Sequence, residues 1–189
     1  MQIPGNIKDY VKVYDFLPKI ICDGIVKEVE QIRWRKHEFY HHVTKQLHSS
    51  EHDLSVSFDE FPSKQHIQDS LRNIVDRYIF EDFGEFEWFR KWQGYTRIRL
   101  NRYDQDKSMD THCDHIHSIF DGNLKGVPIL TILGALNDDY SGGELVLWGD
   151  EVIDLPAGSV MVFPSNFLYP HRVNTVTDGV RYSFVSWVW

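Results

Sequence analysis

Residues 127–148 read VPILTILGALNDDYSGGELVLW and contain two apolar runs on either side of a polar turn. The runs at 127–137 and 144–148 are rich in aliphatic residues, as buried strands are. The segment between them, residues 138–143, contains two acidic residues, a serine and two glycines, which is typical of a turn. This stretch therefore predicts two neighbouring strands of a β-sheet.

Further strand patterns flank this pair on both sides. In residues 96–103, Ile98 and Leu100 alternate with a second set that includes Arg99 and Tyr103, so the two sets face opposite sides of a strand. Roughly eight strands within about 95 residues, separated by short turns, favour a sandwich or jelly roll. The other candidate strands lie near 110–117 and at 151–155, 159–163, 171–176 and 180–189.

The first half of the chain has helical periodicity. Apolar residues recur at helical spacing after Pro18, which predicts a helix over residues 18–33. A second helix is expected over residues 64–80, with one apolar stripe. We expect these helices to cover one outer face of the sheet, which makes the protein mainly β with N-terminal helices. The stripe of the second helix consists of Ile67, Leu71, Ile74 and Tyr78.

We expect a single domain over residues 1–189, in which residues 1–94 supply helical support and a variable loop and residues 95–189 form the jelly-roll core. The variable part, residues 36–61, is polar and rich in histidine. Carboxylates or thiols do not recur with these histidines at a paired ligand spacing, so we interpret this stretch as a solvated loop or short hairpin over a site. The histidines are His37, His41, His42, His48 and His52.

Composition excludes several classes of protein. Lys and Arg number 20 against 28 Asp and Glu, a formal charge of −8, whereas proteins that bind nucleic acid mainly through phosphates usually carry a basic face. The chain begins without a signal-peptide pattern, and its apolar runs are too short to span a bilayer, so we expect a cytoplasmic protein without a membrane partner. Cys22 and Cys113 are expected to be reduced thiols. The oligomeric state is not predicted.

His112 and Asp114 carry the clearest metal-binding signal. Residues two apart on a strand point to the same side, so these side chains can converge on one point. His171, at the start of a later predicted strand, can supply a third ligand. Two imidazoles and one carboxylate on one face leave other octahedral positions open, as in non-haem Fe(II) oxygenases. An HxD pair also occurs by chance, and each histidine alone could be an ordinary surface or core-edge residue.

Arg181 and Ser183 lie on the last predicted strand and share one of its faces. A guanidinium and a hydroxyl in this arrangement can bind one carboxylate, the guanidinium in a bidentate manner. A buried arginine without an anionic partner is costly. Arg181 is therefore expected either to bind a carboxylate ligand or to form a structural ion pair with Asp or Glu.

Together these motifs resemble the Fe(II)/2-oxoglutarate-dependent dioxygenases, most closely the prolyl 4-hydroxylase-like branch. The resemblance implies a double-stranded β-helix fold, in which His112, Asp114 and His171 hold Fe(II) and Arg181 binds the distal carboxylate of 2-oxoglutarate. It runs from Tyr103 through the HxD pair and then through LGALN (133–137), SGGEL (141–145), PAGS (156–159), PHRV (170–173) and GVRYSF (179–184).

The resemblance also assigns residues around the cosubstrate. Tyr103 would face it and could donate a hydrogen bond, Leu145 would line its slot, and Val173 would lie beside the distal histidine. Trp187 matches an aromatic residue near the metal, although plain core packing is equally consistent. Several hydroxylases have a tyrosine where this chain has Ala135; its hydrogen bond must come from Thr131, Ser183 or water, or be absent.

Three further residues near the predicted site have open roles. His115 and His117 are out of phase with the HxD pair, which favours a place at the substrate rim or in solvent. Arg99 shares a strand face with Tyr103, so it could meet a substrate carboxylate. It could equally pair with an acidic residue such as Glu144, and we leave it outside the predicted site.

The resemblance implies an enzyme that hydroxylates an unactivated C–H bond with Fe(II) and 2-oxoglutarate and releases succinate and CO2. A peptidyl proline is the first candidate substrate, which makes a protein or peptide the expected partner; another protein residue or a free amino acid remains open. Ascorbate is a further candidate cofactor. Two alternatives remain, a nucleic-acid demethylase of the same superfamily and a cupin-type metal-binding jelly roll without 2-oxoglutarate. A distal arginine turned outwards would favour the cupin type.

Overall fold

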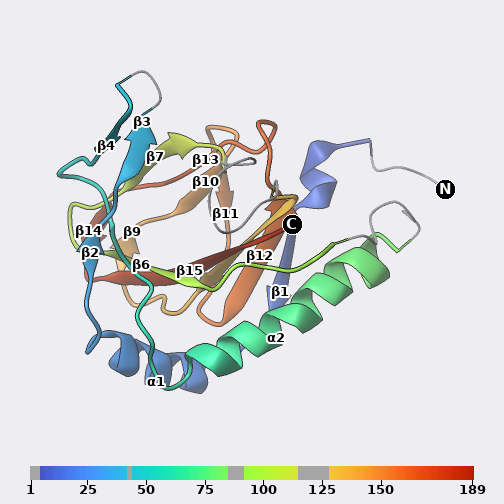
Figure 1. Ribbon diagram of the computed structural model, residues 1–189, viewed down its shortest axis with the longest axis horizontal. Helices are drawn as coiled ribbons and strands as arrows, with labels where there is room; N and C mark the ends of the chain where they lie inside the picture. The colour runs from blue at the N-terminus through green and yellow to red at the C-terminus, as the bar shows by residue number, and fades with distance from the viewer. Residues whose placement is uncertain (1–4, 42–43, 85–91, 115–127) are drawn as a thin grey trace.

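The computed structural model describes residues 5–41, 44–84, 92–114 and 128–189, and two antiparallel sheets dominate it (Figure 1). The large sheet has the order β1-β12-β8-β15-β6-β5-β2, and the smaller sheet the order β11-β10-β13-β7. The large sheet consists of β1 (Lys12–Asp15), β2 (Arg35–Lys36), β5 (Ser55–Ser57), β6 (Arg99–Tyr103), β8 (Leu130–Ala135), β12 (Ser159–Pro164) and β15 (Arg181–Val188). The smaller sheet consists of β7 (Met109–His112), β10 (Leu145–Leu147), β11 (Glu151–Ile153) and β13 (His171–Val173).

Two apolar cores lie on opposite faces of the large sheet. One lies between the two sheets, where Leu133 of β8 packs with Leu145 of β10 and Val173 of β13. The other lies under the helices, where Ile132 and Phe184 pack with helical residues. Because neighbouring strand residues point to opposite sides, β8 and β12 supply side chains to both cores. This two-layer arrangement is the predicted jelly roll with helices on one sheet.

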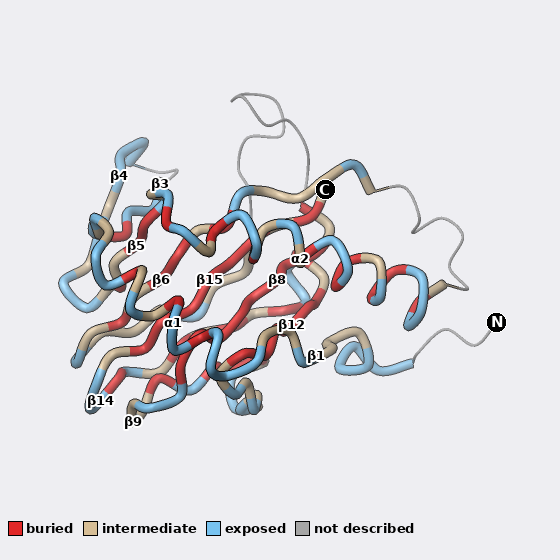
Figure 2. The backbone as a smooth tube through the Cα atoms, turned by 90° about the horizontal axis from the view of Figure 1, so that it is seen from below, coloured by how far each residue is buried: buried red, intermediate tan, exposed pale blue. Residues whose placement is uncertain are grey.

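The helices α1 (Lys19–Val29) and α2 (Lys64–Asp76) cover one face of the large sheet, and the buried strands behind them are visible in Figure 2. A π-helical segment, η2 (Arg77–Asp82), continues α2. A short 3₁₀ helix, η1 (Ile7–Tyr10), precedes β1. The predicted apolar stripe of the second helix is confirmed, because all four of its residues are buried.

The first helix ends earlier than predicted, at Val29 instead of residue 33. The indole nitrogen of Trp34 donates to the Val29 carbonyl at 3.0 Å, which satisfies one of the carbonyls that a helix end leaves without an intrahelical partner. The chain then turns into β2. Within the described ranges, helices that are both long and apolar enough to cross a membrane are absent.

The polar segment 36–61 contains more sheet than predicted. It forms the expected hairpin, β3 (Phe39–His41) with β4 (Gln46–His48), but β5 also pairs with β6 at the edge of the large sheet. The interpretation of this segment as solvated is wrong for His37, which is only 6% exposed. The strand predicted near 110–117 is seen as β7, and residues 115–117 lie outside the described part of the chain. The remaining two-stranded sheet joins β9 (Ser141–Gly142) to β14 (Val176–Asp178).

Candidate metal centre

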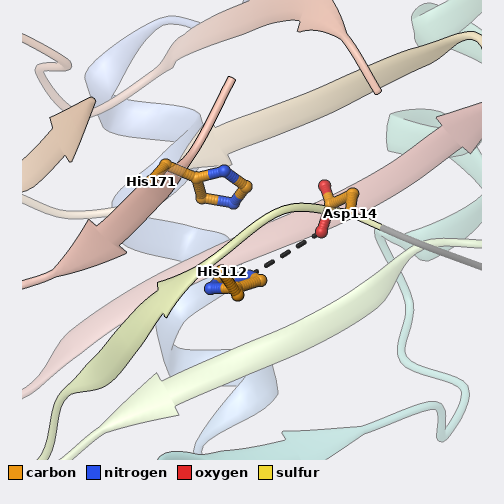
Figure 3. A group of neighbouring side chains, drawn as sticks. All are labelled: His112, Asp114 and His171. Carbon is orange, nitrogen blue, oxygen red and sulfur yellow. Dashed lines mark ion pairs between the residues drawn. The ribbon is translucent and has the colours of Figure 1, made fainter. Parts of the chain in front are cut away.

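His112, Asp114 and His171 come together between the sheets, as Figure 3 shows. Strands β7 and β13 pair in antiparallel register with His112 directly opposite His171, and the centroids of the two rings lie 4.3 Å apart. Asp114 follows two residues after His112. One potential ligand atom from each residue lies within 4.8 Å of the others. The predicted ligand set is therefore assembled by strand pairing plus a two-residue step.

Backbone carbonyls orient both imidazole rings. The Nδ1 of His112 lies 2.8 Å from the carbonyl oxygen of Asp110, and the Nδ1 of His171 lies 3.1 Å from that of Tyr169. A carbonyl can only accept, so each Nδ1 carries a proton and donates, which leaves each Nε2 with a lone pair. A hydrogen bond from the ring nitrogen that does not bind the metal is the usual way in which proteins orient a metal-binding histidine.

The carboxylate of Asp114 is anchored from the opposite sheet. The Thr131 hydroxyl on β8 donates to its Oδ2 at 2.7 Å, whereas its Oδ1 lies 3.7 Å from His112 Nε2. Burial raises the pKa of Asp114, but the charges of His171 and His112 and the Thr131 hydrogen bond outweigh burial, so the pKa is lowered. Asp114 is thus ionised at neutral pH, with one oxygen facing the imidazoles.

The pKa of His112 is lowered as well, first by burial and then by His171, although Asp114 opposes the shift. A lowered pKa favours the neutral imidazole, which is the form that binds a metal. Two imidazole nitrogens and one carboxylate suit Fe(II), and the remaining coordination positions stay open to other ligands. These residues therefore fit the predicted Fe(II) ion.

The guanidinium of Arg181 is buried on the inner face of the large sheet, the face that also lines the metal centre. Arg181 is 2% exposed, donates from Nη1 to Ser183 Oγ at 3.0 Å, and lies over the Tyr103 ring at 5.1 Å from its centroid. Its Nε has no hydrogen-bond partner, and no described Asp or Glu forms an ion pair with it. The alternative of a structural ion pair is thus not seen among the described residues. An arginine turned outwards would favour the cupin type, whereas Arg181 is buried.

The other predicted cosubstrate residues surround this inner face. Tyr103 and Val173 line a pocket that also contains the three candidate ligands, and Leu145 lines an adjoining pocket of about 520 Å³ beside Arg181. Ala135 lies directly opposite Ser183 in the sheet. Thr131 is engaged by Asp114, so it is not placed to replace the family tyrosine, whereas Ser183 already contacts Arg181.

The sequence did not predict every residue near the centre, and two of the residues that it did indicate lie outside the described part of the chain. Trp187 lines the metal pocket, so its surroundings match the aromatic residue expected near the metal. Arg99, which shares a strand face with Tyr103 but was left outside the predicted site, lines the metal pocket. The sequence did not indicate that His37 would be buried within electrostatic reach of Arg99 and His112, because it lies in a segment without a recognisable motif. His115 and His117 lie outside the described residues.

Residues 98–189 match the model of the 2OG-Fe(II) oxygenase superfamily. A PKHD-type hydroxylase of Rippkaea orientalis is 38% identical over 94 residues, which are 48% of this chain and 41% of the relative. One from Thermosynechococcus vestitus is 43% identical over 97 residues, covering 48% and 42%. The match thus spans only about two fifths of the length of these curated relatives.

Solved structures of low sequence identity share the fold. A Trichoplax adhaerens prolyl hydroxylase, solved with a peptide fragment of the hypoxia inducible factor oxygen degradation domain, has a TM-score of 0.69 at 17% identity and covers 96% of this chain and 84% of its own. A viral collagen prolyl hydroxylase from Paramecium Bursaria Chlorella virus-1, in its 2OG complex, has a TM-score of 0.66 at 14% identity, covering 95% and 94%. The fold is therefore prolyl 4-hydroxylase-like.

Proposed function

We propose that this chain is an Fe(II)- and 2-oxoglutarate-dependent hydroxylase that acts on a peptidyl proline. One observation carries the proposal: a buried guanidinium that pairs with no acidic residue in the described part of the chain faces the same interior as a two-histidine, one-carboxylate cluster. A buried charge without a partner costs free energy. A bound anion would remove this cost. Together the two groups match a metal-chelating dicarboxylic acid.

Each residue has a separate task in this proposal. His112, Asp114 and His171 hold the ion, and the described carbonyls and the Thr131 hydroxyl orient them. Arg181 and Ser183 bind the distal carboxylate of 2-oxoglutarate, and Tyr103 faces the same molecule. Leu145 and Val173 supply apolar walls that keep water away from the reacting atoms. We also propose that residues 95–189 form the catalytic core of a single domain.

When bound, Fe(II) and 2-oxoglutarate would supply the chemistry by which O2 turns a C–H bond into a C–OH group: one oxygen atom enters the hydroxyl and the other enters succinate, and the cosubstrate loses CO2. The protein contributes binding and orientation, because fixing both ends of the cosubstrate lowers the entropic cost of the reactive arrangement. A peptide substrate is supported by the peptide-bound Trichoplax structure, and proline by the prolyl hydroxylases of the same fold. Ascorbate stays a prediction.

The test needs no substrate. We expect the apoprotein, given Fe(II) and then 2-oxoglutarate without oxygen, to develop the weak visible charge-transfer band of the metal-bound keto acid. His171→Ala should lose the band, and the exposed His66→Ala on α2 serves as the matched histidine control. A wild-type protein that binds iron but shows no band would contradict the proposal and favour the cupin type.

Arg181 is tested in the same titration. Removing its charge-assisted contact should weaken 2-oxoglutarate binding by about 2–3 kcal/mol, while iron binding is retained. We expect Arg181→Gln to need a much higher 2-oxoglutarate concentration for half of the band. Equal half-saturation in wild type and variant would refute the assignment.

A further inference from the structure

We propose that Arg99 is a substrate-binding residue that selects a carboxylate on the substrate, next to the metal centre. This inference rests on the proposed function and names the substrate class more closely. The carboxylate can be an acidic side chain flanking the target residue or a free chain terminus.

Arg99 and Arg181 lie at opposite ends of one inner face. In the register of β6 and β15, Tyr103 pairs with Arg181, whereas Arg99 pairs with Val185. Four residues of strand separate the two register positions, which is roughly 13 Å at about 3.3 Å per residue. Arg181 lies at the end of this face that contains Ser183. Arg99 lies at the other end, in the pocket that contains all three candidate metal ligands.

Neighbouring side chains hold the Arg99 guanidinium in a defined orientation. Its Nε donates to the Asn101 side-chain oxygen at 3.1 Å, and its central carbon lies over the Trp187 ring at 5.2 Å from the centroid. Asn101 is buried and Trp187 lines the same pocket. Because Nε is engaged, the two terminal nitrogens remain to bind a carboxylate in a bidentate manner.

Described acidic residues do not neutralise Arg99. Four other arginines, Arg72, Arg77, Arg97 and Arg102, form ion pairs with Asp or Glu, and Arg99 does not. Glu144, which the sequence offered as a partner, accepts a hydrogen bond from Asn174 instead. The carboxylate of Asp114 is engaged by Thr131 and lies outside ion-pair distance of Arg99. A half-buried guanidinium beside a metal centre, with no ion pair to any acidic residue that the structure describes, suits an anionic ligand.

His37 supplies a second unused polar group in this region. Its side chain is 6% exposed, and its Nδ1 is buried without a hydrogen-bond partner among the described residues. Burial, followed by the positive charge of Arg99, lowers the pKa of His37 to about 4. His37 is therefore neutral at physiological pH, and it lies close enough to Arg99 for the charge of the guanidinium to lower its pKa. A neutral imidazole can hydrogen-bond a substrate without adding a second charge.

The test compares matched peptides on the protein loaded with Fe(II) and 2-oxoglutarate without oxygen. The probes are acetylated pentapeptides with a central proline, in Glu/Gln pairs beside the proline and in carboxylate/amide pairs at the C-terminus. Peptide binding is followed by the change in the charge-transfer band. We expect at least one carboxylate peptide to bind wild type tenfold or more tightly than its neutral partner. The pair that shows the preference identifies the source of the carboxylate.

The variants separate charge recognition from folding. Arg99→Gln should reduce the preference to within twofold, whereas Arg99→Lys, which keeps the charge, should retain part of it. Arg102→Gln is the matched control, because Arg102 lies on the same strand but pairs with Asp104 at 2.7 Å. It should keep the full preference.

The outcomes distinguish this inference from the proposed function. Loss of the peptide-free band in wild type would overturn the proposed function. A normal band with an equal response to both members of every peptide pair, including no response, would overturn the role of Arg99 alone. A preference that survives in Arg99→Gln would do the same.

Discussion

At the scale of single residues, the geometry of the candidate metal centre depends on a threonine that is not one of its three candidate ligands. Thr131 reaches from the large sheet and fixes Oδ2 of Asp114, so that Oδ1 is left toward the imidazoles. Asp114 is thereby restrained to one geometry. Such outer hydrogen bonds commonly contribute 10–100-fold to metal affinity.

Replacing Thr131 by valine keeps the shape of the side chain but removes the hydroxyl. We expect Thr131→Val to bind Fe(II) roughly 10–100-fold more weakly, because Asp114 then lacks its donor. Anaerobic competition with a chelator of known affinity measures this change. The exposed Thr177→Val is the control, and equal affinities for all three proteins would show that the hydrogen bond is irrelevant to binding.

His37 makes the stability of the fold dependent on pH. Its pKa is about 4 in the fold against an ordinary value of 6.5, so between these values the unfolded chain takes up a proton that the folded chain does not. Stability from His37 is therefore complete above about pH 6.5 and falls as the pH drops toward 4. The size is of the order of 1–2 kcal/mol after allowance for solvent screening.

This pH effect is measured by urea unfolding of wild type and His37→Gln at pH 7 and pH 4.5. The difference between their free energies of unfolding should shift by about 1–2 kcal/mol in favour of the variant at the lower pH. The exposed His52→Gln, from the same segment, should show no such shift. A pH-independent difference for His37→Gln would contradict the assignment.

At the scale of elements, strand β8 contributes side chains to the apolar cores on both faces of the large sheet. It pairs with β12 on one side and β15 on the other, and it sends Leu133 toward the metal-side core and Ile132 toward the helices. Gly134 lies opposite Phe184 of β15, and a Cβ at Gly134 would collide with the Phe184 ring. The glycine makes room for that ring under the helices.

Gly134→Ala is expected to destabilise the fold by about 1–3 kcal/mol, because overpacking outweighs the usual gain from removing a glycine. Gly24→Ala in α1 is the matched control, since no atom lies within 4 Å of the added Cβ. That variant should be stabilised by up to about 1 kcal/mol. Urea unfolding measures both, and effects of the same sign would contradict the packing argument.

At the scale of the whole molecule, the candidate metal site joins the two sheets. The imidazoles belong to β7 and β13, while the carboxylate that completes the set is anchored to β8. An ion bound only by the folded chain should therefore stabilise the complete jelly roll. This linkage can be measured without any substrate.

We expect Fe(II) at 100 times its dissociation constant to stabilise the protein by about 2.7 kcal/mol. For a chain of this size the thermal midpoint should rise by roughly 5–10 °C under anaerobic conditions, and a chelator should reverse the rise. Calorimetry of wild type and His112→Ala makes the comparison. An equal rise in both proteins would place the ion elsewhere.

Much of the fold was readable because each strand carries its own periodicity. Strands β6, β8 and β15 lie within the predicted ranges and β12 extends one residue beyond its range, since alternation and apolar runs are local signals. The short strands β1, β2 and β5 were not predicted. Each has two to four residues, and their place in the sheet depends on partners far along the chain.

The HxD spacing, the shared strand faces and the family resemblance together predicted His112, Asp114, His171 and Arg181 as site residues, and the strand periodicity predicted the two-layer class of the fold. The folded structure was needed to show that Thr131 anchors Asp114, that Arg99 lines the metal pocket and that buried His37 lies within electrostatic reach of Arg99. These contacts join segments that are distant along the chain. Their geometry is set by sheet register and burial, which no local pattern specifies.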